Sequence, residues 1–208
     1  MSEYSIYISL LSFIIAGVTL YLTQLRPPKF EIHYGQKLRI NYQSNGTGAA
    51  FYIPITFINL SHSTGTVFKC SVAISRVDTP QQIFYMEWKE FRKLNVEKNL
   101  WVYEDMAHPI PISGRSSVNK ICWFVWESEP KFLFKEGTYK FQFFSWSSSD
   151  AKPDRHTEHE LFISEAISTR LSNYKSKKKS TLVEVGFDKT IDANKLMTPH
   201  EVENLLSF

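Results

Sequence analysis

The sequence is poor in the residues that build most recognisable catalytic and cofactor sites. Only 8 of its 208 residues are glycine, and it contains neither a glycine-rich phosphate loop nor a Gly-x-Ser-x-Gly nucleophile motif. Two cysteines are too few for a disulfide scaffold. A formal net charge of +3 excludes a polycation that binds nucleic acid through its overall charge. We therefore expect no enzyme activity, no cofactor and no nucleic-acid partner.

The remaining candidates for chemistry are isolated. Cys70 and Cys122 both stand in apolar strand-like runs, where burial raises the pKa of a thiol and leaves it unreactive. His156 and His159 are three residues apart, so in a strand they lie on opposite faces and do not readily share a metal. Arg115 follows Gly114 and is interpreted as a turn residue. The sequence thus predicts no catalytic residue and no metal site.

What the sequence does contain is one long uncharged run, residues 6–25. About 20 helical residues, each rising 1.5 Å, cover the ~30 Å hydrocarbon core of a bilayer. Tyr4 and Tyr21 fall near the two ends, and Arg26 and Pro27 end the run. We interpret residues 1–28 as an uncleaved transmembrane anchor. The alternative, a cleaved signal peptide, is less favoured because no basic residue precedes the run.

The flanking charges predict an orientation. Arg26, Lys29, Lys37 and Arg39 follow the span, whereas no lysine or arginine precedes it. Because basic residues are retained on the cytoplasmic side, we expect a single-pass membrane protein whose large domain is cytoplasmic. The alternative places the domain outside, where the sequons at residues 45–47 and 59–61 would be relevant.

The span also carries a stripe of small or weakly polar residues at alternating spacings of four and three. In lipid, helices associate through close packing and interhelical hydrogen bonds, and small residues permit both. The alternative is that the hydroxyls bond back to carbonyls four residues earlier, which requires no partner. We expect the stripe to pack against other membrane helices, and its members are Ser5, Ser9, Ser12, Ala16, Thr19 and Thr23.

Residues 29–165 have the alternating pattern of half-buried strands, and aromatics, which suit pleated sheets, form 15% of the chain. Pro54 lacks an N–H and predicts an edge position or a bulge. The pattern of residues 83–94 is ambiguous: residues 83–86 could form a strand, and residues 87–94 could form a helical turn or an exposed edge strand. We expect a mainly β sandwich with strands at residues 30–34, 38–42, 51–60, 67–75, 121–126, 138–146 and 159–163.

Two segments carry a resemblance to a known family. Residues 51–61, with Gly65 and Val67 after them, resemble the second-strand corner of immunoglobulin-like modules, and residues 136–141 resemble a tyrosine corner centred on Tyr139. Phe141 stands where the antibody pattern has a cysteine, so no inter-sheet disulfide is expected. The resemblance covers residues 30–163 at the level of fold. It implies an immunoglobulin-like sandwich and no particular activity.

Residues 166–208 differ in composition and are predicted to form a basic linker and a tail with a late strand at 181–187 and a short C-terminal helix. Thr198, Pro199 and Glu201 are typical of a helix start. The linker lysines either contact anionic lipid or, as we favour, are solvated. The helix either docks on its own sandwich or binds a partner. The residues concerned are Lys175, Lys177, Lys178 and Lys179 for lipid, and Val202, Leu205 and Leu206 for a partner.

Together these features predict a membrane-anchored binding module rather than a catalyst. We expect a scaffold, sensor or accessory subunit whose partners are the bilayer and other membrane helices, either copies of itself or those of a partner subunit. An extracytoplasmic ligand-binding or adhesion module is the first alternative. An enzyme with a dispersed site is the second.

Overall fold

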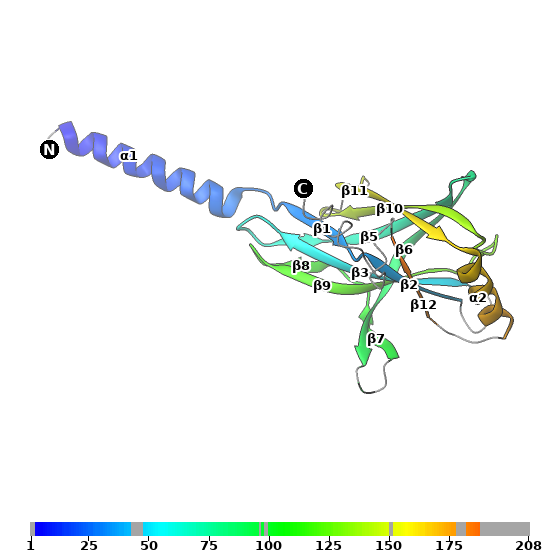
Figure 1. Cartoon of the computed structure of the whole chain (residues 1–208). Helices are drawn as coiled ribbons and strands as arrows, with labels where there is room; N and C mark the ends of the chain where they lie inside the picture. Colours follow the sequence, from blue (N-terminus) through cyan, green and yellow to red (C-terminus); the bar gives the residue numbers. More distant parts are fainter. Residues whose placement is uncertain are drawn as a thin grey trace, which may run out of the picture.

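The N-terminal helix projects from the rest of the protein (Figure 1). The structure, a computed structural model, describes residues 3–42, 48–95, 97, 100–149, 152–177 and 182–187. Helix α1 (Glu3–Leu20) continues into one π-helical turn, η1 (Tyr21–Leu25). The stretch Tyr4–Thr23 has a mean hydropathy of 2.0, and none of it is buried. By length and composition this helix can cross a membrane, a property that an N-terminal signal sequence shares.

The remainder is mainly β, as the sequence predicts. One short helix, α2 (Glu165–Ser176), interrupts the strands near their end. The strands are β1 (Phe30–Tyr34), β2 (Lys37–Tyr42), β3 (Ala49–Asn59), β4 (Gly65–Val67), β5 (Lys69–Arg76), β6 (Thr79–Asn95), β7 (Leu100–Met106), β8 (Ile110–Ile112), β9 (Ser117–Trp126), β10 (Gly137–Trp146), β11 (Arg155–Ile163) and β12 (Val183–Gly186).

Within the described residues, ten of these strands form one sheet in the order β11-β10-β5-β6-β9-β3-β2-β12, with β1 added beside β3 and β7 beside β6. The long strand β6 joins the two halves: residues 83–87 pair with β5, whereas residues 88–92 pair with β9. The sheet therefore curls instead of dividing into two separate sheets. The immunoglobulin-like sandwich is therefore not confirmed. The sequence did not predict that one strand is shared by both halves, because the pattern of residues 83–94 is ambiguous.

The core lies where the two halves of the curled sheet face each other. Tyr34 of β1 stacks on Phe143 of β10, with ring centroids 4.0 Å apart. Phe51 of β3 meets Phe134 and Phe141 edge to face at 5.8 and 6.0 Å. These three phenylalanines are fully buried. Aromatic pairs of this geometry add to the free energy gained by burying apolar area, so the high aromatic content is used in the core.

Pro54 lies in the interior of the sheet, so the prediction of an edge position is wrong. Strand β3 pairs with β9 along one side, opposite Ile121 at this point. On its other side, β2 pairs with residues 49–52 and β1 with residues 55–59, which leaves Pro54 between the two partners. Its carbonyl accepts a hydrogen bond from the Gly35 N–H (2.8 Å) in the β1–β2 turn. A residue without an N–H is tolerated there because no partner strand needs the donor.

Part of the segment predicted as a basic linker is helical. Ser164 caps α2, and its hydroxyl accepts a hydrogen bond from the Ile167 N–H (3.4 Å). Leu171 is buried in the core, and Ile167 and Tyr174, on the same face of the helix, pack against the core as well. Strand β12 pairs with β2 at one end of the sheet path. The predicted C-terminal helix lies outside the described residues and is not confirmed.

Tyr139 has the local geometry of a tyrosine corner. Its hydroxyl accepts a hydrogen bond from the Lys135 N–H (2.8 Å) and donates one to the Lys135 carbonyl (3.1 Å). The residue is buried, and the resulting loss of hydration raises the pKa of its hydroxyl. The corner fixes residues 135–139 at the start of β10. This local role does not depend on whether the whole fold is related to immunoglobulin-like modules.

We predict that Tyr139→Phe lowers the free energy of unfolding by about 1 kcal/mol or more, because two backbone groups lose a buried hydrogen-bond partner. Urea denaturation of the full chain in mild detergent, followed by tryptophan fluorescence, measures the change. Tyr103→Phe is the matched control, since Tyr103 is half exposed. Equal midpoints for both variants would remove the corner as a stabilising element.

Candidate functional site

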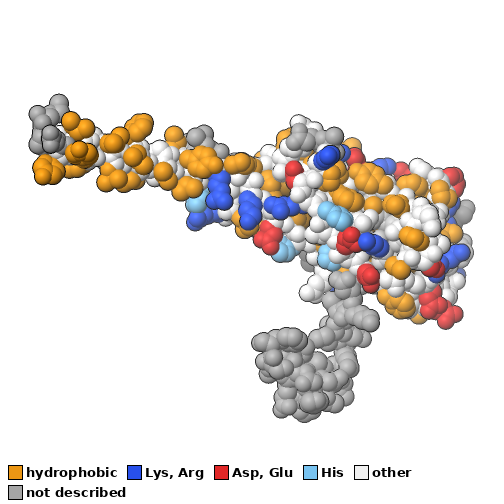
Figure 2. All heavy atoms as spheres, turned by 90° about the horizontal axis from the view of Figure 1, so that it is seen from above, with side chains coloured by type: hydrophobic (Ala, Val, Ile, Leu, Met, Phe, Trp, Pro, Cys, Tyr) orange, Lys and Arg blue, Asp and Glu red, His pale blue; other side chains and the backbone are white. Residues whose placement is uncertain are grey.

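Two pockets lie at the end of the domain from which α1 emerges. The short connection of residues 26–29 joins the helix to β1, and it lines both pockets through different side chains. Figure 2 shows lysine, arginine and histidine side chains gathered where the apolar helix meets the domain. This end of the molecule is the candidate functional site, because it is the part of the domain that would face a membrane crossed by α1.

A buried asparagine organises this end. Asn59, the last residue of β3, has no exposed surface. Its amide donates to the carbonyls of Ser63 (2.8 Å) and Ile112 (3.0 Å). Its carbonyl oxygen accepts from both the N–H and the hydroxyl of Ser61, at 3.0 and 2.5 Å. One side chain thus joins the loop after β3 to strand β8, and we call this arrangement the Asn59 clasp.

The clasp also holds the connection to α1. The Leu60 N–H donates to the Lys29 carbonyl (2.8 Å), and the Ser63 hydroxyl donates to the Arg26 carbonyl (2.9 Å). Gly65 lies against the same connection, since a Cβ there would be only 2.5 Å from Pro28. The backbone that leaves the helix is therefore bonded to the domain at both of its ends.

A second loop, residues 113–116 between β8 and β9, packs against the first. The Arg115 N–H donates to the Ser61 carbonyl (2.8 Å). Arg115 has a φ of 52°, in the left-handed region that non-glycine residues rarely adopt. Gly114 is required by the close approach, because a Cβ there would lie 1.8 Å from the His62 carbonyl oxygen. Both loops are thus held in one arrangement around the emerging helix.

These segments enclose a basic pocket of about 290 Å³. The end of the helix contributes Leu22, and the two loops and the connection contribute the remainder. No carboxylate lines it, and no ion pair of its three lysine or arginine side chains is found within the described residues. We call it the basic pocket, and its residues are Leu22, Arg26, Lys29, Leu60, Ser61, His62 and Arg115.

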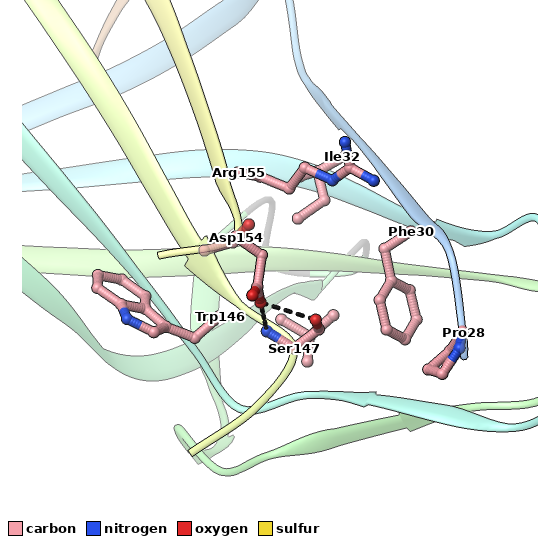
Figure 3. A pocket seen from close by; sticks show the side chains of 9 residues that line it. Pro28, Phe30, Ile32, Trp146, Ser147, Asp154 and Arg155 are labelled. Atoms are coloured by element: carbon pink, nitrogen blue, oxygen red, sulfur yellow. Dashed lines mark hydrogen bonds between the residues drawn. The ribbon is translucent and has the colours of Figure 1, made fainter. Parts of the chain in front are cut away.

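The second pocket, of about 330 Å³, lies between β1 and the ends of β10 and β11 (Figure 3). Pro28 and Phe30 form one wall, and Trp146, Ser147 and Asp154 lie opposite. The Asp154 carboxylate accepts hydrogen bonds from the N–H and the hydroxyl of Ser147, the latter at 2.7 Å. Because that carboxylate closes the β10–β11 turn, its oxygens serve the local structure, and the pocket presents no paired acid and base.

The cysteines and histidines singled out in the sequence lie in the core and on strand β11, respectively. Cys70 and Cys122 are fully buried, and burial raises the pKa of each thiol well above its ordinary value. His156 stacks on Phe144 at the surface (ring centroids 4.9 Å apart), whereas His159 turns inward toward the ring of Tyr34. The part of the chain that the structure describes holds no group of three metal-ligating side chains.

The polar stripe of α1 is satisfied within the helix. Hydroxyls bond to carbonyls four residues earlier, from Ser9 to Ser5 (2.8 Å) and from Thr19 to Ile15 (2.8 Å), and Ser12 and Thr23 do the same. This is the alternative that requires no partner helix. Close packing of a second helix along the stripe stays a prediction, because the side chains on that face, including Ala16, are small whether or not their hydroxyls are bonded within the helix.

The predicted lipid and partner sites of the tail lie elsewhere or outside the structure. Helix α2, which carries Lys175, lies at the end of the domain away from α1 (Figure 1). The Lys175 ammonium lies 5.2 Å from the ring centroid of Tyr42. Lipid contact by Lys175 and Lys177 stays the less favoured alternative to a solvated linker. Lys178, Lys179, Val202, Leu205 and Leu206 lie outside the described residues.

Two basic residues of the basic pocket, His62 and Arg115, were not predicted as site residues. Lys37 and Arg39 were predicted as membrane-flanking charges, but both bond to the Glu184 carboxylate on β12 at 3.2 Å. The sequence contains only a weak indication of this pocket. Gly114 followed by Arg115 predicts a tight turn, but it does not predict that the turn contacts residues 60–62.

Comparisons with known proteins add little. No protein-family model and no curated protein matches the chain. Among solved structures, a putative ApaA protein from Bordetella pertussis matches with a TM-score of 0.33 and 6% sequence identity, over 79% of this chain and 98% of that one. A similarity this low carries no argument about fold or function.

Proposed function

We propose that the protein is a single-pass membrane-anchored binding module, a scaffold, sensor or accessory subunit of a membrane assembly. Helix α1 spans the bilayer, and the curled β domain stands at the membrane surface. The observation that carries the proposal is the combination of a wholly exposed apolar helix with a connection that is hydrogen-bonded to the domain at Arg26 and Lys29. These bonds fix the point at which the helix leaves the domain, as the proposed anchor requires.

We further propose that the domain is cytoplasmic. Basic residues gather on the domain side of α1, which supports this orientation. Asn59 supports it too. A glycan on the 59–61 sequon would have to join the amide nitrogen that donates to Ser63 and Ile112, within a side chain of zero exposure. The extracytoplasmic alternative would leave that sequon unused in the folded protein.

The tyrosine corner at Tyr139 supports a distant relation to immunoglobulin-like binding modules.

Labelling with a membrane-impermeant maleimide tests the orientation. In intact cells we expect Ser2→Cys to be labelled and Ser172→Cys, on the exposed side of α2, to be labelled only after lysis. The parent chain is the control: its two thiols are buried, and their raised pKa keeps them unreactive at neutral pH.

The reverse labelling pattern would identify an extracytoplasmic module instead. Recovery of a soluble protein whose mass lacks residues 1–25 would identify α1 as a signal sequence. Either result would contradict the proposal.

We propose that the partners include other membrane helices, either copies of α1 or those of a partner subunit. The face formed by the small residues of α1 supports this, because it permits closer approach of a second backbone than a face of leucines does. With four hydroxyls bonded inside the helix, the association would depend on packing rather than on interhelical hydrogen bonds.

Replacing Ser12 and Ala16 together by leucine is expected to abolish assembly, because the larger side chains keep a second helix away from this face. The same replacement of Ile14 and Ile15 is the matched control and is expected to leave assembly unchanged. Size-exclusion chromatography with light scattering in mild detergent gives the oligomer size, and co-purification detects a partner subunit. Assembly that survives the first double variant would reduce α1 to a simple tether.

A further inference from the structure

The basic pocket is built by segments that the sequence keeps far apart, at residues 22–29, 60–62 and 115. Arg26, Lys29 and Arg115 line it together, and none of its lining residues is a carboxylate. The nearest acidic residue along the chain, Glu31, contacts His33 instead (3.1 Å). Elsewhere on the domain several basic side chains are neutralised, as Lys69 is by Glu87 and Lys120 by Glu104. Three permanent charges left together at one pocket mark a site for an anion.

The backbone that carries these charges is held in place without a ligand. Arg115 occupies a left-handed conformation that glycine or asparagine would adopt more easily, and its N–H is fixed on the Ser61 carbonyl. Ser61 is in turn held by the Asn59 clasp. A turn whose only task was structural would not need an arginine at this position. The guanidinium adds charge and a planar set of donors, which suit a phosphate group.

The remaining lining residues indicate where the phosphate comes from. Leu22 belongs to the last turns of the membrane helix, and Leu60, which is 48% exposed, projects from the loop beside it. An apolar wall on the helix side and cations on the domain side match a phospholipid, whose acyl chains follow the helix while its phosphate lies at the interface. A free phosphate ion would use the cations and leave the leucines without a role.

We propose that the basic pocket binds the phosphate of an anionic phospholipid in the leaflet from which the domain emerges. The inference rests on the proposed function in that α1 must remain in the bilayer. The bound headgroup is shared by Arg26 and Lys29 of the connection and by Arg115 of the domain. Lipid binding therefore adds a second link between helix and domain at the membrane surface, beside the hydrogen bonds of the connection.

The test titrates dioleoyl-phosphatidylglycerol into the full chain in dodecyl maltoside and counts bound lipid by native mass spectrometry. Dioleoyl-phosphatidylcholine, which carries no net charge, is the control lipid. We expect phosphatidylglycerol to bind more tightly, and Arg115→Gln and Lys29→Gln each to weaken it about fivefold, the factor that corresponds to one basic residue near an anionic surface. Lys93→Gln is the matched control, because Lys93 is exposed and lies in a different pocket.

Equal binding of the two lipids, or equal loss in Lys93→Gln and the pocket variants, would overturn the proposal. Inorganic phosphate is titrated in parallel. Binding of phosphate that is as tight as that of the lipid and equally sensitive to Arg115→Gln would assign the pocket to a soluble anion and also overturn it. The experiment uses detergent and the uncleaved chain, so its result is independent of the orientation measured by labelling. Failure of one proposal is thus distinguishable from failure of the other.

Discussion

The buried side chain of Asn59 is the interaction on which the membrane-proximal end of the protein depends. Its amide makes four hydrogen bonds with Ser61, Ser63 and Ile112, and it has no contact with solvent. A buried hydrogen-bonding group left without a partner costs about 1–3 kcal/mol. Without the amide, the Ser63 carbonyl would keep only its bond to the Ser61 hydroxyl (3.1 Å). An asparagine suits this place because only an amide offers both donors and acceptors in a fixed plane.

The clasp makes the connection to α1 part of the domain. Arg26 and Lys29 are bonded to the clasped loop through their carbonyls, and their exposed side chains line the basic pocket. The same loop receives Arg115, so charges from the connection and from the domain meet in one pocket. Under the proposed function, the orientation of the domain relative to the membrane follows from these local hydrogen bonds and does not need a flexible linker.

Much of the fold was predictable because it follows from short-range patterns. Strands β1, β9 and β10 follow from alternation or from continuous apolar runs, and the Tyr139 corner follows from its local motif. The curl of the sheet was not predictable. It depends on β6, whose two halves have different partners, and the polar and apolar residues of that strand do not alternate regularly. Helix α2 was missed because its apolar face is short: only Ile167, Leu171 and Tyr174 follow the helical spacing, within an otherwise polar segment.

The candidate site was predictable only in part. The helix and its flanking Arg26 and Lys29 are visible in the sequence, since adjacent residues supply them. The contribution of Arg115 is not, because a tertiary contact over more than fifty residues brings it to Ser61. For the same reason Lys37 and Arg39, close to the helix in sequence, were assigned to the membrane although Glu184 of β12 neutralises them.

A distance measurement between α1 and the domain tests the central claim most directly. Spin labels are placed at Phe13→Cys on the exposed surface of α1 and at Ser172→Cys on α2, in the full chain in lipid nanodiscs. The account predicts one narrow distance distribution for the parent chain. Asn59→Ala, which removes the clasp, is expected to broaden it. Asn119→Ala, at an exposed position, is the control and is expected to leave it narrow. A distribution that is broad in the parent, or that Asn59→Ala leaves narrow, would contradict the account.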